Sequence, residues 1–173
     1  MKRMKEMAVI LVAALLVCPV LSWAEEEEYR SDLSVAELYL CFAAETGDKA
    51  IFRDLMKESA KPNLNCKCYN DGSTPLTLSV ARGYHTFAEM LIEAGAQVDA
   101  LSLQWAIEEE YGALVDLFLS KNPDLCLPSQ EGPFGYPASK YAPSDWMEKK
   151  LLNAEKKANL KVDSQGRCTV KKS

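Results

Sequence analysis

The stretch from Thr74 to Ala100, TPLTLSVARGYHTFAEMLIEAGAQVDA, constrains the fold more than any other part of the chain. Apolar residues recur at helical spacing on both sides of Gly83, which predicts two short helices joined by a tight turn. Thr74 is placed to cap the first helix, with Pro75 in its first turn, and Gly95 to end the second helix in a left-handed conformation. Helices of this length cannot bury their apolar faces alone, so other helices must pack against them.

The same pattern occurs before and after this stretch. Upstream, a capping box at Ser34–Glu37 opens a predicted helix that ends at Gly47, and a second helix is expected over about 49–59. Downstream, residues 103–124 form another predicted pair, with Leu103 in its first helix.

A fourth, degraded unit follows, in which residues 136–142 are expected to form a first helix and Asp145–Glu148 a second capping box. Equivalent positions in the four units are 36, 27 and 35 residues apart: Leu40, Leu76, Leu103 and Ala138. The chain therefore contains an internal repeat, and stacking of its units would bury one continuous core.

Residues 74–100 resemble the ankyrin repeat consensus without a gap. Thr74, Pro75 and Leu76 match the Thr-Pro-Leu-His start of that repeat, with Thr77 in place of the histidine, and residues 91–96 match its end. The resemblance implies the all-α class: an ankyrin-type helical-hairpin solenoid of about four repeats over residues 33–160, with degenerate outer repeats.

The resemblance also implies a non-catalytic function, the binding of another protein through the concave face formed by hairpin tips and first helices. Trp105 aligns with a core position of the family, which favours a packing role. The residues expected to bind the partner lie at the best-preserved hairpin tip, on or near the first helices, and in the fourth unit: Tyr69, Asn70, Asp71, Thr77, Arg82, Gln104, Glu108 and Lys140.

Composition and motifs exclude several other classes of function. His85 is the only histidine, and the chain has no Gly-rich phosphate loop and no Gly-x-Ser-x-Gly elbow, so we expect no enzyme activity, cofactor or metal. The mature chain carries 17 Lys and Arg against 24 Asp and Glu. This negative charge disfavours binding to nucleic acid and anionic membranes and favours a protein partner with a basic patch. We expect the protein itself to be a monomer.

The N-terminus has the layout of a secretory signal. A basic start, a short apolar run and small residues before Glu25 predict a signal peptide over 1–24, followed by an acidic leader over 25–32. The run is too short for a membrane anchor, and Val17 disfavours a lipoprotein signal ending at Cys18. We therefore expect an exported protein, periplasmic or secreted, from a bacterium, with a polar C-terminal tail over 161–173.

Five cysteines remain in the mature chain, so at least one is unpaired or paired between chains. A Cys126–Cys168 disulfide is the preferred pair because it would hold the polar tail, whereas Cys66–Cys126 would span two repeats. The Cys66-Lys67-Cys68 motif suggests an alternative function, a thiol-based redox or metal-handling factor, although zinc sites usually have four ligands. Structural pairing of one or both of these cysteines is the other interpretation.

Overall fold

The computed structural model describes residues 29–59, 61–128 and 134–169. The predicted signal peptide, 1–24, and residues 25–28 of the predicted acidic leader lie outside the described residues. No described helix is both long enough and apolar enough to cross a membrane.

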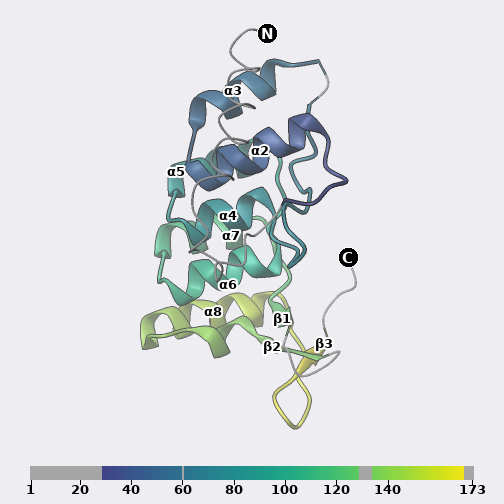
Figure 1. The fold of residues 1–173 in the computed structure, drawn as a ribbon. Coiled ribbons are helices and arrows are strands. Elements are labelled where there is room, and N and C mark those ends of the chain that lie inside the picture. The colour runs from purple at the N-terminus through teal and green to yellow at the C-terminus, as the bar shows by residue number, and fades with distance from the viewer. Residues whose placement is uncertain (1–28, 60, 129–133, 170–173) are drawn as a thin grey trace, which may run out of the picture.

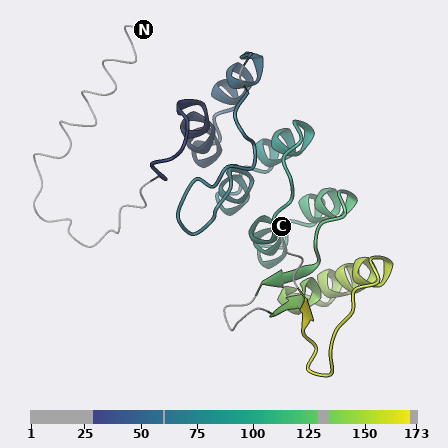
Figure 2. The same cartoon turned by 90° about the vertical axis from the view of Figure 1, so that its right-hand side faces the viewer.

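Three helix pairs follow one another along the chain and stack in sequence order (Figure 1). Figure 2 shows the helices end-on, with the first helices of the pairs in one row and the second helices in another. The pairs are α2 (Val35–Thr46) with α3 (Lys49–Lys57), α4 (Pro75–Ala81) with α5 (His85–Glu93), and α6 (Ala100–Glu108) with α7 (Gly112–Ser120).

Left-handed turns end the helices at equivalent positions in the units. The first helices are followed by Gly47, Gly83 and Glu110, with φ of 69°, 74° and 57°. The second helices of the last three units are followed by Gly95, Asn122 and Asn159, with φ of 104°, 52° and 52°. Because each turn reverses the chain in the same way, successive pairs lie parallel and stack, which confirms the predicted solenoid.

The core runs through all four units. The four positions predicted to be equivalent, Leu40, Leu76, Leu103 and Ala138, are each at most 1% exposed. The larger side chains Phe87 and Phe118 on the second helices are fully buried as well. Each unit therefore buries its apolar side against its neighbours, as expected for a repeat that cannot fold alone.

A hydrogen-bond network joins the second and third units below the surface. The Asp99 carboxylate caps α6 by accepting the amide of Ser102, and it also accepts the hydroxyls of Thr74 at 2.7 Å and Thr77 at 3.1 Å. Thr74 in turn caps α4. The cap of one helix thus supports the cap of the next, which fixes the register between units.

The fourth unit departs from the prediction. A full first helix was expected over 136–142, but the structure has a single 3-10 turn, η2 (Ala138–Tyr141), before α8 (Asp145–Lys157). Pro137 and Pro143 bound this turn, and a residue that precedes proline avoids the α conformation, so a longer helix has no room. The predicted capping box at Asp145–Glu148 is also wrong: Ser144 is the N-cap residue and makes no side-chain cap bond.

A small antiparallel sheet of three strands was not predicted at all. It contains β1 (Cys126–Pro128), β2 (Phe134–Pro137) and β3 (Cys168–Thr169), in the order β1-β2-β3. Strand β3 belongs to the predicted polar tail, of which residues 170–173 lie outside the described residues. The tail returns to the body because Cys168 forms a disulfide with Cys126, the pair preferred from the sequence, and both cysteines are buried.

Candidate functional site

An exposed apolar stripe lies on the first helices. On α2 it consists of Val35, Tyr39 and Phe42, and on α6 of Leu101 and Trp105, all between 38% and 66% exposed. Their spacing of three or four residues places the members from each helix on one side of that helix. We call this side of α2 and α6, together with the corresponding side of α4 between them, the first-helix face.

Phe42 and Trp105 occupy equivalent positions in their units, because each lies five residues before the left-handed residue that ends its helix. Leu78 has the same position on α4, which lies between α2 and α6 (Figure 2), and it is only 8% exposed. The exposed apolar residues therefore lie on α2 and α6, and the corresponding position on α4 between them is buried. Trp105 was expected to be a core residue, but at 39% exposure much of its indole is accessible to solvent.

Carboxylates lie at the C-terminal ends of the first helices. Glu45 on α2 and Glu108 on α6 hold equivalent positions, three residues after Phe42 and Trp105. Glu108 is exposed and accepts a hydrogen bond from the Gln104 side chain at 2.8 Å. Glu109, the C-cap residue of α6, is exposed next to it. The apolar stripe is thus bordered by carboxylates.

Glu45 is the centre of a polar cluster at one edge of this face. Its carboxylate accepts the hydroxyls of Tyr29 at 2.6 Å and Tyr69 at 3.0 Å, and it pairs with the Arg82 guanidinium at 2.7 Å. The rings of Tyr29 and Tyr69 stack with centroids 4.9 Å apart. Partial burial alone would raise the pKa of Glu45, but the three donors together favour its charged form and hold that pKa below its usual value.

The structure places the predicted partner-binding residues in different environments. Tyr69, predicted to lie at the hairpin tip, is buried, because its ring stacks on Tyr29 and its hydroxyl binds Glu45, so little of its side chain is accessible to a partner. Thr77 is buried as well, at 2% exposed, because its hydroxyl is held by Asp99. No sequence pattern indicates the contact with Tyr29, which lies in the predicted leader.

The other six predicted residues have accessible side chains. Asn70 and Asp71 are exposed at the tip of the loop before α4, where Asp71 accepts the amide and hydroxyl of Ser73. Arg82 and Glu108 are exposed, and Gln104 is half-buried. Lys140 is exposed in η2, which packs against α6, and its ammonium lies 5.1 Å from the ring centroid of Tyr136.

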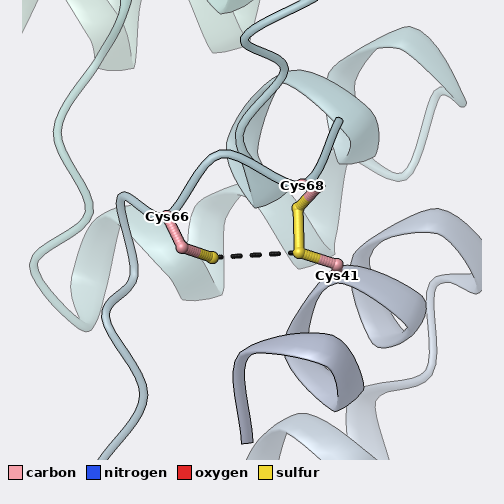
Figure 3. Close-up of side chains that lie close together, drawn as sticks. All are labelled: Cys41, Cys66 and Cys68. Carbon is pink, nitrogen blue, oxygen red and sulfur yellow. Dashed lines mark hydrogen bonds between the residues drawn. A yellow bond between two sulfur atoms is a disulfide. The ribbon is translucent and has the colours of Figure 1, made fainter. Parts of the chain in front are cut away.

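A second cluster consists of three sulfur atoms between α2 and the loop before α4 (Figure 3). Cys41 and Cys68 form a disulfide, and the Cys66 sulfur lies 3.8 Å from that of Cys41. All three side chains are buried. Cys66 is the one unpaired cysteine among the described residues. The prediction that Cys66 and Cys68 act together as a reactive pair is contradicted, because Cys68 is bonded to a residue on α2.

The chemistry open to this cluster depends on its oxidation state. The three sulfurs lie within 4.8 Å of one another, so they could hold a soft metal ion only after reduction of the Cys41–Cys68 disulfide. Burial, together with the charge of Glu37, raises the pKa of the Cys66 thiol to about 11. At neutral pH the thiol is therefore protonated and shielded from external oxidants or alkylating reagents.

Comparison with known protein families decides which family has this architecture. A family model of ankyrin repeats, present in three copies, matches residues 40–129. The chain belongs to the ankyrin repeat family. The match begins within α2, runs through the second and third helix pairs and ends before β2, so the fourth unit, with its single 3-10 turn, lies outside it. A search of curated proteins finds no match to this ankyrin repeat chain.

Membership in the ankyrin repeat family indicates a general kind of function. Ankyrin repeats are protein–protein interaction modules, and the family is generally non-catalytic. The accessible aromatic stripe and its acidic border are the features of this ankyrin repeat chain that such an interaction could use.

Proposed function

We propose that this protein binds another protein through the first-helix face, the concave side of the solenoid, and that its contact segment combines apolar and basic side chains. The observation that carries the proposal is the exposure of Phe42 and Trp105 at equivalent positions on α2 and α6. Both aromatics lie outside the buried core, to which their helices contribute Leu40 and Leu103.

An apolar stripe of this kind is suited to binding. Contiguous exposed apolar surface on a soluble protein commonly marks an interaction site, and aromatic residues dominate the energies of measured interfaces. The helices that carry the stripe are fixed by the stacked core, so little conformational entropy would be lost when a partner binds.

The charge of the face sets the expected chemistry of the partner. Glu108 and Glu109 lie beside Trp105, and Glu45 lies one turn beyond Phe42. Lys or Arg side chains of the partner would find the exposed carboxylates of Glu108 and Glu109 next to the Trp105 ring, whereas Glu45 is already paired with Arg82. Such pairing would accelerate association and exclude acidic competitors. The negative charge of the whole mature chain acts in the same direction.

We further propose that the protein is an exported monomer, periplasmic or secreted, of a bacterium. The signal-like segment over 1–24 supports export. The two disulfides, Cys41–Cys68 and Cys126–Cys168, support it independently, because such bonds persist mainly in oxidising compartments. Fractionation of the native host with an antibody against residues 29–169 would test the location, and recovery in the cytosolic fraction would contradict it.

The binding proposal can be tested by affinity capture from the exported fraction, followed by cross-linking. The Phe42→Ala/Trp105→Ala double variant should lose the captured partner, with at least a tenfold drop in affinity. The matched control is Trp146→Ala on α8, which removes an aromatic side chain of similar exposure, 47%, from outside the first-helix row.

Each outcome of this experiment has a clear meaning. Retention by the control and loss by the double variant, with cross-links to α2, α4 or α6, would support the proposal. Equal binding by the double variant and the unmodified protein would reject the first-helix face as the binding site. Circular dichroism on each variant separates lost binding from lost folding.

A further inference from the structure

The sulfur cluster has a geometry that the proposed binding function does not use. The Cys66 thiol is in contact with a disulfide: its sulfur lies 3.8 Å from the sulfur of Cys41, which is bonded to Cys68 at 2.07 Å. Figure 3 shows the three side chains converging from α2 and from the loop before α4. A thiol in this position is shielded from external partners and has one reaction partner within reach.

We propose that Cys41, Cys66 and Cys68 form an internal thiol–disulfide exchange site, in which Cys41 can be bonded to either Cys66 or Cys68. The deprotonated sulfur of Cys66 attacks the sulfur of Cys41, and a Cys41–Cys66 bond forms. The Cys41–Cys68 bond breaks, and its electron pair leaves on the sulfur of Cys68. Cys68 then takes up the proton that Cys66 released, so the reaction consumes no external oxidant or reductant.

Chain topology does not favour one pairing over the other in the unfolded state. The two loops would span 25 and 27 residues, which are nearly equal in closure entropy. The balance between the pairings is therefore set by packing in the folded protein. In the structure this packing favours Cys68, whose amide donates to Ser73 at 2.7 Å and whose carbonyl accepts the amide of Arg30 at 3.0 Å.

The exchange changes how the loop before α4 is attached to α2. Cys68 opens the turn that includes Tyr69, which binds Glu45 on the first-helix face. With Cys66 bonded to Cys41 instead, the covalent link lies two residues earlier in the chain, and this turn is held by noncovalent contacts alone. The proposal concerns the sulfur chemistry and does not depend on the proposed binding partner.

The rate of exchange should depend strongly on pH. Only the thiolate attacks a disulfide, and burial with the negative charge of Glu37 opposes its formation, whereas the neighbouring Lys67 favours it. Because the pKa of Cys66 is raised to about 11, the rate should increase roughly tenfold for each pH unit between pH 7.5 and 9.5.

Tryptic mapping distinguishes the two pairings, because Lys67 separates the cysteines. Digestion of the oxidised protein, after an acid quench and alkylation, yields Cys41 in peptide 31–49, Cys66 in 58–67 and Cys68 in 68–82. After incubation at pH 9.5 we expect a new cross-linked product of 31–49 with 58–67, together with alkylated 68–82. The Cys66→Ser variant should not form this product.

The Cys68→Ser variant tests the alternative bond directly. Under mild oxidation we expect Cys41 and Cys66 to form a disulfide while the far-ultraviolet circular dichroism stays native. The proposal is overturned if the folded variant keeps both thiols free, or if the unmodified protein shows only the Cys41–Cys68 linkage at every pH. Linkage of Cys66 to Cys126 or Cys168 would also overturn it, because exchange would then pass through the unfolded chain.

Discussion

At the residue scale, Glu45 shows how a partly buried charge joins distant parts of the chain. Its carboxylate binds Tyr29 in the segment before α2, Tyr69 in the loop before α4 and Arg82 at the end of α4. Its side chain is 23% exposed, so solvent screens these contacts only in part. The cluster therefore contributes to stability through the charged form of Glu45.

We predict that Glu45→Gln lowers the free energy of unfolding by about 1 kcal/mol at pH 7, because charge-assisted hydrogen bonds become neutral ones. The pKa of Glu45 is depressed in the folded state, so its contribution is complete above the unfolded pKa and is lost as pH falls through the folded pKa. Urea denaturation at pH 7 and pH 3 should therefore show a difference between wild type and variant that shrinks at acid pH.

Glu109→Gln is the matched control for this prediction. It makes the same chemical change at an exposed carboxylate in the C-cap of α6. Its effect on the urea midpoint should be small at both pH values. A loss at pH 7 for Glu109→Gln as large as that for Glu45→Gln would contradict the role assigned to the cluster.

At the scale of single elements, the turn from α6 to α7 is the least favourable of the three first-helix turns. Glycine adopts the left-handed conformation at Gly47 and Gly83, whereas Glu110 adopts it with a side chain, at φ 57°. A Cβ in that region has a steric cost that glycine avoids. Glu110 gains some compensation, because its carboxylate accepts the hydroxyl of Ser144 at the start of α8.

We predict that Glu110→Gly, in a Ser144→Ala background that removes this hydrogen bond, raises the free energy of unfolding by about 1 kcal/mol. Glu109→Gly is the control, since Glu109 has φ −86° and gains no relief from glycine. Chemical denaturation of the wild type, the Ser144→Ala variant and the two glycine variants in the Ser144→Ala background measures the effect. Equal changes for the two glycine substitutions would show that the left-handed turn carries no strain.

The Cys126–Cys168 disulfide acts on another element, the short strand β3. It closes a separation of 42 residues with Cα atoms 5.8 Å apart. We predict that Cys126→Ala/Cys168→Ala lowers the free energy of unfolding by about 4 kcal/mol on the chain-entropy account. Trypsin should then cut first at Lys161 and Arg167, detected by mass spectrometry, and unchanged protection there would contradict the role of the bond.

At the scale of the whole molecule, stability comes from contacts between neighbouring units. Leu103 is fully buried on α6, which packs against α4 on one side and against η2 and β1 on the other. Loss of its side chain would open a cavity where the second, third and fourth units meet. Leu101, two residues earlier on the same helix, is 38% exposed on the first-helix face.

We predict that Leu103→Ala lowers the free energy of unfolding by about 3 kcal/mol, and that Leu101→Ala lowers it by less than about 1 kcal/mol. Urea denaturation followed by circular dichroism measures both. Because units in a solenoid are stabilised by their neighbours, the Leu103→Ala transition should also be less cooperative, which comparison of unfolding curves at several wavelengths detects. Equal losses for the two variants would mean that the buried contacts between units at Leu103 are not the main source of stability.

Much of this architecture could be predicted from local patterns in the sequence. The helix pairs, the capping box at Ser34 and the core positions Leu40, Leu76 and Leu103 follow from helical periodicity and from caps. The candidate site was predicted less well. Arg82 and Glu108 are accessible as expected, but Tyr69 and Thr77 are buried, and the exposure of Trp105 was missed.

The sequence by itself determined the repeat, because the period of apolar residues and the turn residues act within a few positions along the chain. Only the tertiary structure decided the Cys41–Cys68 pairing, the Glu45 cluster and the β3 strand. These features bring together residues 27, 24 and 42 positions apart, as in Cys41–Cys68, Glu45–Tyr69 and Cys126–Cys168. Such contacts depend on how the units stack in space, which no local pattern of side chains records.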